Sequence, residues 1–152
     1  MGITRSTEVL QRWRQSPRMT LLAAFEDSSG GTRVRDFCQM LIRDLGSQCS
    51  VIEHVWLFST LRMRELRQIA AEEAASADLI IVSAERSDDL PKEVKDWIEL
   101  LLHHNLRRPT VLVALMDPYY EGASTAVQSY LQDAARRGGM EFLVLSREVP
   151  DM

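Results

Sequence analysis

Four short segments of this chain are apolar at almost every position, and they constrain the fold more than any other feature. They are 19–26 (MTLLAAFE), 78–84 (DLIIVSA), 109–117 (PTVLVALMD) and 140–146 (MEFLVLS). A strand that is covered on both faces reads as a continuous apolar run, as in a parallel sheet between helices. A fifth segment, 50–59 (SVIEHVWLFS), also reads as a strand but includes polar residues. The pattern predicts a five-stranded parallel sheet with helices on both faces.

Amphipathic segments lie between these runs and predict helices. The first has an apolar face formed by Val34, Phe37, Cys38, Leu41, Ile42 and Leu45, and Gly46 follows as a stop. The second, 62–77, is predicted to turn inward Met63, Leu66, Ile69, Ala70 and Ala74. The third follows Pro91, a helix starter, and carries an apolar stripe of Val94, Trp97, Ile98, Leu101 and Leu102. The fourth is predicted to begin at a capping box of Thr125 and Gln128 and to end at Gly138 and Gly139.

Strands and helices alternate along the chain, which predicts right-handed crossovers between parallel strands. The expected fold is a three-layer, doubly wound α/β sandwich with strand order 2-1-3-4-5. Only six residues follow the last predicted strand, so we expect the fold to lack the usual C-terminal helix. We expect the N-terminal segment, 1–18, to form a short helix on the sheet, with Thr7 as its cap and Val9, Leu10 and Trp13 as its apolar stripe. Residues 19–152 form the main domain.

Composition excludes several classes of function. The 152 residues fit one domain, and 18 basic against 22 acidic residues give a net charge of −4, which disfavours nucleic-acid binding. The apolar run 21–25 is too short to cross a membrane, and the residues before it do not resemble a signal peptide. Cys38 and Cys49 lack the close spacing of a redox or zinc motif, and the three histidines suggest no metal site. We therefore expect a cytoplasmic protein with reduced thiols.

Three predicted loops meet where the strand order reverses, at the carboxyl ends of the strands, and this is where doubly wound proteins bind ligands. They are 26–32, 84–91 and 117–124. The first loop offers hydroxyls, glycines and a nearby cation at the amino end of a helix, a combination that suits a phosphate: Ser28, Ser29, Gly30, Gly31, Thr32 and Arg33. Glu26 and Asp27 precede it and would repel a phosphate if they pointed inward. The residues alone leave a phosphate loop and a plain connection equally open.

The second loop and the helix after it carry a resemblance to a known family. The segment 77–100 (ADLIIVSAERSDDLPKEVKDWIEL) resembles the NADPH-dependent FMN reductases of the flavodoxin superfamily, with matching or similar residues at Glu85, Leu90, Pro91, Val94, Lys95, Ile98 and Glu99. The segment 121–139 is similar to the helix that follows strand four in that family. The resemblance implies a flavodoxin-like fold with FMN as cofactor and NAD(P)H as co-substrate.

Under this resemblance the FMN phosphate lies on residues 28–32, and the flavin ring lies between two other groups of residues. One is Glu85, Arg86 and Ser87, and the other includes Asp117, Tyr119 and Tyr120. No acid or base residue is nominated as catalytic. The family also suggests a homodimer, with the helix that carries Trp97 as a candidate surface. Trp97 lies on the apolar stripe of that helix and fits a core or dimer contact better than a cofactor contact.

The chain also departs from the family pattern. Ala84, Arg86 and Ser87 stand where the family has proline, tyrosine and asparagine, and the segment 117–122 (DPYYEG) replaces a glycine pair. An alternative hypothesis is therefore a non-enzymatic module that has kept the fold, lost FMN and acts in protein interaction. A phosphoacceptor receiver domain is disfavoured, because strand three has no aspartate at its tip and strand five ends in arginine rather than lysine.

Overall fold

The predicted doubly wound sheet is present in the structure, a computed structural model that describes residues 11–47, 49–84, 89–104, 106, 110–116 and 125–145. All strand pairs are parallel, and the order is β2-β1-β3-β4-β5, as predicted. The strands are β1 (Arg18–Phe25), β2 (Ser50–Leu57), β3 (Leu79–Ala84), β4 (Val111–Met116) and β5 (Glu141–Leu145). The helices are α2 (Ser28–Leu45), the 3₁₀ helix η1 (Phe58–Arg62), α3 (Arg64–Ala75), α4 (Lys92–Leu102) and α5 (Thr125–Gly138).

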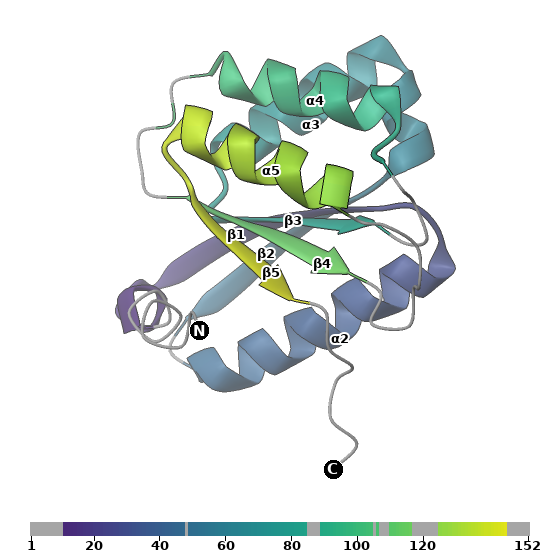
Figure 1. The fold of residues 1–152 in the computed structure, drawn as a ribbon. Coiled ribbons are helices and arrows are strands. Elements are labelled where there is room, and N and C mark those ends of the chain that lie inside the picture. The colour runs from purple at the N-terminus through teal and green to yellow at the C-terminus, as the bar shows by residue number, and fades with distance from the viewer. Residues whose placement is uncertain are drawn as a thin grey trace.

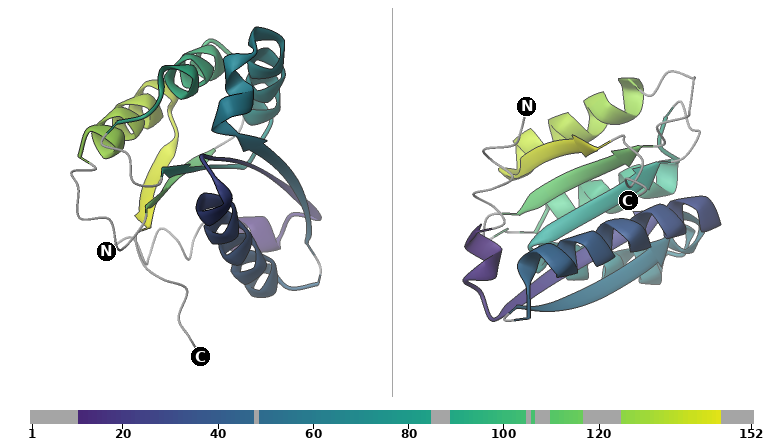
Figure 2. Two further views of the ribbon diagram at one scale, coloured as in Figure 1. Left: turned by 90° about the vertical axis from the view of Figure 1, so that its right-hand side faces the viewer. Right: turned by 90° about the horizontal axis from the view of Figure 1, so that it is seen from below.

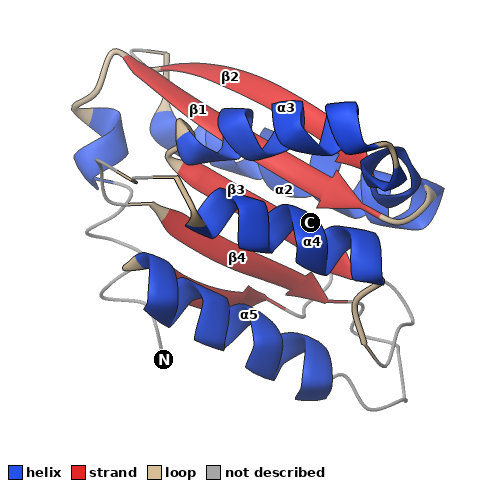
Figure 3. Cartoon of the chain, turned by 90° about the horizontal axis from the view of Figure 1, so that it is seen from above, coloured by secondary structure: helices blue, strands red, loops and turns tan. Residues whose placement is uncertain are grey.

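The helices cover the two faces of the sheet unequally. α3, α4 and α5 lie together on one face, and α2 lies on the other (Figure 1). The left view of Figure 2 shows the sheet between the two helical layers. Seen from above, α3, α4 and α5 lie side by side over the strands (Figure 3). The carboxyl ends of β3 and β4 point toward the edge at which α2 begins (Figure 1).

Side chains alternate along the central strands and divide the core in two. On β3, Ile80 and Val82 face α3 and α4, whereas Leu79 and Ile81 face α2. Both sets are buried, which explains why this strand has no polar alternation. Trp97 of α4 is fully buried in the larger core cluster, so the indole belongs to the interior of a single chain.

The predicted helix ends are confirmed where they are described. α2 ends at Leu45, and Gly46 takes a φ of 80°, a left-handed value that a side chain would strain. α5 ends at Gly138, and Gly139 has a φ of 67°. Pro91 directly precedes α4. The side chain of Thr125, half of the predicted capping box, lies outside the described residues.

The inward faces of two helices differ from the prediction. In α3 the buried residues are Ala70, Ala71 and Ala74, whereas Met63 and Ile69 are exposed. The alanines let the helix backbone approach the sheet closely, and this turns the larger side chains outward. In α2 the inner stripe is Val34, Cys38, Leu41 and Leu45, which leaves Ile42 exposed beyond its edge.

The described part of the N-terminal segment is helical at residues 11–14 and lies on the same face as α2. Trp13 is buried in the core cluster beneath α2, and Arg14 Nε donates to the Asp44 carbonyl oxygen at 2.9 Å. Residues 1–10, including Thr7, Val9 and Leu10, lie outside the described residues, so the prediction for this segment as a whole stays open. None of the described helices is long and apolar enough to span a membrane.

Candidate functional site

The amino end of α2 lies where the strand order reverses. β1 is flanked by β2 on one side and by β3 on the other, and α2 follows β1 after only two residues, Glu26 and Asp27. The first turn of α2 is therefore at the carboxyl edge of the sheet, beside the crevice in which doubly wound proteins bind ligands. This placement agrees with the position expected for the first loop.

The predicted phosphate loop is helical rather than irregular. α2 begins at Ser28, so residues 28–32 form its first turns, and neither Gly30 nor Gly31 has a positive φ. Ser28, Ser29 and Thr32 are exposed to solvent, whereas Gly30 is buried. The amides of the first helical turn have no partner within a helix. For Ser28 and Ser29, no other described group accepts a hydrogen bond from the amide.

Gly31 has a packing role that the sequence did not reveal. A Cβ atom at this position would lie 3.0 Å from Cε2 and 3.3 Å from Cζ of the Phe25 ring. Phe25 is the last residue of β1, and its half-buried ring packs against the core beneath α2. The glycine therefore lets the end of β1 and the start of α2 pack closely, whether or not a ligand binds beside them.

Asp27 caps the helix with its own negative charge. Its carboxylate Oδ1 accepts a hydrogen bond from the Gly30 amide at 3.1 Å, and its carbonyl oxygen accepts one from the Gly31 amide at 2.9 Å. An aspartate at this position stabilises a helix through both the hydrogen bond and the helix dipole. The capping carboxylate thus satisfies one first-turn amide and places a negative charge beside the other two.

One buried hydroxyl near this edge was not identified from the sequence. Ser83, the penultimate residue of β3, is fully buried, and its Oγ has no hydrogen-bond partner among the described residues. It pairs in register with Phe25 of β1 and Leu115 of β4, so it lies near the carboxyl ends of three strands. A single serine inside an apolar strand gives no sequence signal for such a position.

The residues predicted to hold the flavin ring lie outside the described residues. These are Glu85, Arg86 and Ser87 in the second loop and Asp117, Tyr119 and Tyr120 in the third. The structure places the ends of β3 and β4, Ala84 and Met116, side by side in register at the carboxyl edge. The two loops therefore leave the sheet from neighbouring positions.

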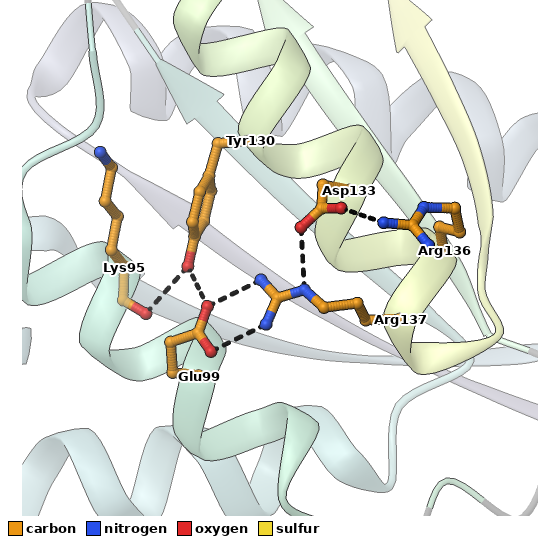
Figure 4. A network of polar contacts seen from close by, with 6 residues as sticks. All are labelled: Lys95, Glu99, Tyr130, Asp133, Arg136 and Arg137. Atoms are coloured by element: carbon orange, nitrogen blue, oxygen red, sulfur yellow. Dashed lines mark hydrogen bonds and ion pairs between the residues drawn. The ribbon is translucent and has the colours of Figure 1, made fainter.

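Lys95 and Glu99, two polar residues of the family resemblance, take part in contacts between α4 and α5 (Figure 4). Glu99 of α4 receives two hydrogen bonds from the Arg137 guanidinium of α5, at 2.9 and 2.8 Å. The Tyr130 hydroxyl donates to Glu99 Oε2 at 2.7 Å and lies 3.3 Å from the Lys95 carbonyl oxygen. Lys95 Nζ pairs with Asp89 at 2.8 Å and lies 5.3 Å from the centre of the Tyr130 ring. We call the set Lys95, Glu99, Tyr130 and Arg137 the α4–α5 clamp.

The clamp changes the ionisation of its members. Hydrogen bonds from Arg137 and Tyr130 lower the pKa of Glu99 from 4.5 to about 2. Burial and the Glu99 carboxylate raise the pKa of Tyr130, and the Glu99 hydrogen bonds raise that of Arg137. Asp133 pairs with Arg136 and Arg137 on the outer side of α5. These shifts are explained by mutual pairing, so they indicate no catalytic acid or base.

The remaining candidates have structural partners. His54 Nδ1 lies 3.6 Å from the Glu73 carboxylate, as expected for a structural histidine. Both cysteines are buried as free thiols, and burial together with a hydrogen bond to Glu53 raises the pKa of Cys38 to about 12. Within the described ranges, no group of three or more His, Cys, Asp or Glu side chains is arranged to hold a metal ion.

Comparison with solved structures supports the fold assignment. A short-chain flavodoxin associated with a bacterial microcompartment matches this chain with a TM-score of 0.58 and 16% sequence identity. The match covers 89% of this chain and 86% of the flavodoxin. The fold is therefore flavodoxin-like. No protein-family model matches the chain. No curated protein matches it either.

Proposed function

We propose that this protein binds FMN at the carboxyl edge of its sheet, with the phosphate at the first turn of α2. The observation that carries the proposal is the group of exposed donors at that turn. The amides of Ser28 and Ser29 and the hydroxyls of Ser28, Ser29 and Thr32 lie at a helix amino end beside the strand reversal. Amides and hydroxyls at a helix amino end are the donor set that phosphate groups use.

Two features of the turn set the strength of this binding. Two amides and the hydroxyls can receive the phosphate while Asp27 keeps its bond to Gly30. The Asp27 carboxylate opposes the ligand, because like unit charges about 5 Å apart repel by roughly 1 kcal/mol in water and roughly 3 kcal/mol at a protein surface. Asp27 is exposed, so the smaller value applies. The donors fit a phosphate, and the cap weakens its binding without blocking it.

The finer proposal is a reductase of the flavin or quinone type that uses NAD(P)H. A bound FMN supplies the chemistry of hydride and electron transfer. The protein's part is to orient the ring and shield it from water, with the loops 85–88 and 117–124 as its walls. The structural neighbour is a flavodoxin, which supports flavin binding and leaves the electron donor open.

The direct test is a titration of the purified chain with FMN, followed by flavin fluorescence. Ser29→Glu places a carboxylate among the proposed phosphate donors and is expected to weaken binding at least tenfold. The matched control is Ser47→Glu, which adds the same exposed charge beyond the other end of α2 and is expected to leave the affinity unchanged. Gly31 is unsuitable for this test, because any side chain there meets the Phe25 ring. Absence of FMN binding at near-millimolar concentration would overturn the proposal.

A second function is favoured by one observation, the capping carboxylate itself. The Asp27 carboxylate accepts a hydrogen bond from the Gly30 amide, which a phosphate could otherwise use. This arrangement is expected of a flavodoxin-like module that has lost FMN and acts through protein contacts. The two functions differ in the same titration, and reduction of bound FMN by NADH or NADPH then tests the reductase activity. Bound FMN that neither nucleotide reduces would restrict the function to flavin binding.

A further inference from the structure

The exposed apolar side chains of this protein gather around one edge of the sheet. Seven large apolar residues are exposed among those described. Five of them lie on β2 or on the flanking helices α2 and α3, and a sixth, Met63, directly precedes α3: Ile42, Ile52, Val55, Leu57, Ile69 and Met63. The seventh, Val144, is on β5 at the opposite edge. Apolar residues clustered on a surface mark a contact with another protein, whereas single ones need no explanation.

The cluster is continuous across the edge. On one face, Glu73 of α3 accepts a hydrogen bond from Trp56 Nε1 of β2 at 2.8 Å, and Ile69 lies one helical turn before Glu73. On the other face, Cys38 of α2 contacts Glu53 of β2, and Ile42 lies one turn after Cys38. Ile69 and Ile42 therefore flank β2 above and below. We call β2 with these two residues the β2 edge.

The strand at this edge has little of the usual protection, because Glu53 is its only acidic or basic side chain apart from His54. β2 has eight residues, contains no proline or lysine, and pairs only with β1 among the described strands. No described strand pairs with its outward backbone groups. Natural proteins usually block such an edge with charges, prolines or bulges. Val55, which is 54% exposed, instead presents an apolar side chain to solvent on this strand.

We propose that the β2 edge joins two copies of this chain, with β2 pairing antiparallel to its own copy about a two-fold axis. Such a dimer is isologous, so the same residues face each other across the axis. Opposite side chains must point to the same face of the joined sheet. Because side chains alternate along a strand, the numbers of two opposed residues must sum to an even value.

Charge selects one register from this series. Two of the allowed registers pair almost the full length of β2 with its copy. In one, Glu53 lies opposite Glu53 of the copy, and in the other, His54 lies opposite His54. The first places two Glu53 carboxylates directly opposite each other, which destabilises a sheet. The second places His54 against its copy, and each imidazole already has the Glu73 carboxylate as a partner at 3.6 Å. The axis therefore passes beside His54.

In this register four of the five apolar residues of β2 lie opposite apolar residues of the copy. Val51 lies opposite Leu57 of the copy and Ile52 lies opposite Trp56, while Glu53 lies opposite Val55 rather than its own copy. This self-complementarity favours a second copy over an unrelated partner. The surface differs from α4, whose apolar residues Val94, Trp97, Ile98 and Leu101 are all buried within one chain.

The test is the mass of the full chain in solution, measured by sedimentation, with charged substitutions at the two edges. The wild type is expected to be a dimer at micromolar concentration, and Val55→Lys is expected to make it a monomer. Val144→Lys is the matched control, because it adds the same charge at an exposed valine of the other edge strand, and it is expected to stay dimeric. A monomeric wild type, or dissociation by Val144→Lys alone, would overturn the proposal.

A cysteine scan tests the register without depending on the lysine variant. Opposed residues of an antiparallel pair have Cα atoms about 4.5 to 5.5 Å apart, within the range of a disulfide. Mild oxidation is expected to link the copies of His54→Cys efficiently and those of Glu53→Cys poorly. The native thiols, Cys38 and Cys49, are buried and give a low background. Preferential linkage through position 53, or through neither position, would contradict this register.

Discussion

The α4–α5 clamp and the first turn of α2 both carry polar groups, and they differ in whether those groups are paired within the protein. In the clamp, the Glu99 carboxylate receives hydrogen bonds from Arg137 and Tyr130. At the first turn of α2, the Ser28 and Ser29 amides have no described protein acceptor, and a single carboxylate forms the cap. A polar group whose bonds are complete within the protein stabilises the fold, whereas an exposed donor retains capacity for a ligand. The clamp therefore has a structural role, whereas the turn is where we propose that a ligand binds.

This difference changes the weight of the family resemblance. Lys95 and Glu99 are among its matching positions, and in the structure they hold α4 against neighbouring segments. The resemblance at these two positions is therefore explained by helix packing and does not by itself support flavin binding. The proposed FMN site depends instead on the first turn of α2 and on the loops that follow β3 and β4.

The largest expected effect comes from filling the space between β1 and the turn. Gly31→Val places a branched side chain against the Phe25 ring and is expected to lower the free energy of unfolding by about 1 to 3 kcal/mol. Thr32→Val, one residue later and exposed, is the control and should change it little. Urea unfolding measures both, and equal midpoints would show that the contact with Phe25 has no energetic role.

Glu99→Gln, which removes the ion pair with Arg137, is expected to lower the free energy of unfolding by about 1 kcal/mol at neutral pH. The effect is small because Glu99 and Arg137 are both partly exposed and screened by solvent. The folded pKa of Glu99, about 2, lies below its ordinary value of 4.5, so its contribution is complete above pH 4.5 and is lost as the pH falls toward 2. Glu99→Gln should therefore flatten the acid side of the stability profile.

The control for the clamp is Asp96→Asn, on the same helix, which removes an exposed pair with Lys92. It is expected to change stability by only about 0.3 to 0.5 kcal/mol. Neither variant should alter FMN affinity if the clamp is purely structural. A weaker FMN affinity in Glu99→Gln, with Asp96→Asn unchanged, would extend the site to the clamp.

At the turn, Asp27→Asn keeps a good cap and removes the charge that opposes a phosphate. FMN affinity is expected to rise about fivefold, the equivalent of about 1 kcal/mol. Asp44→Asn, at the other end of α2, should leave the affinity unchanged. A fall in affinity in Asp27→Asn would mean that the carboxylate helps to hold the ligand.

The smallest effect is expected at Ser83. Because its buried hydroxyl has no partner in the described part of the chain, Ser83→Ala is expected to leave stability unchanged or to raise it by up to about 1 kcal/mol. Thr110→Val provides the contrast, since the Thr110 hydroxyl donates to the Ala77 carbonyl oxygen at 3.3 Å and its loss should destabilise the fold. Thermal unfolding compares them, and a clear loss of stability in Ser83→Ala would indicate a partner for this hydroxyl.

The sequence predicted the sheet well, because strands such as 79–84 are covered on both faces and tolerate few polar residues. It predicted the inner face of α3 less well, since its alanines and its larger apolar residues form two competing stripes. The position of the first turn of α2 could also be predicted, since it follows from strand order alone.

The contacts of the site could not be predicted in the same way. The Phe25 ring meets Gly31 only after β1 and α2 are packed, and Arg137 reaches Glu99 across 38 positions of the chain. The Asp27 cap is local, and an aspartate three residues before Gly30 is a signal that would have identified it.

The most direct test of a phosphate at the first turn of α2 is the ratio of the dissociation constants of riboflavin and FMN, which differ by the phosphate alone. The wild type is expected to bind FMN at least tenfold more tightly than riboflavin, a difference of about 1.4 kcal/mol. In Ser29→Glu the ratio should fall toward one, and in Ser47→Glu it should stay at the wild-type value. Equal affinities for the two flavins in the wild type would contradict a phosphate site at this turn.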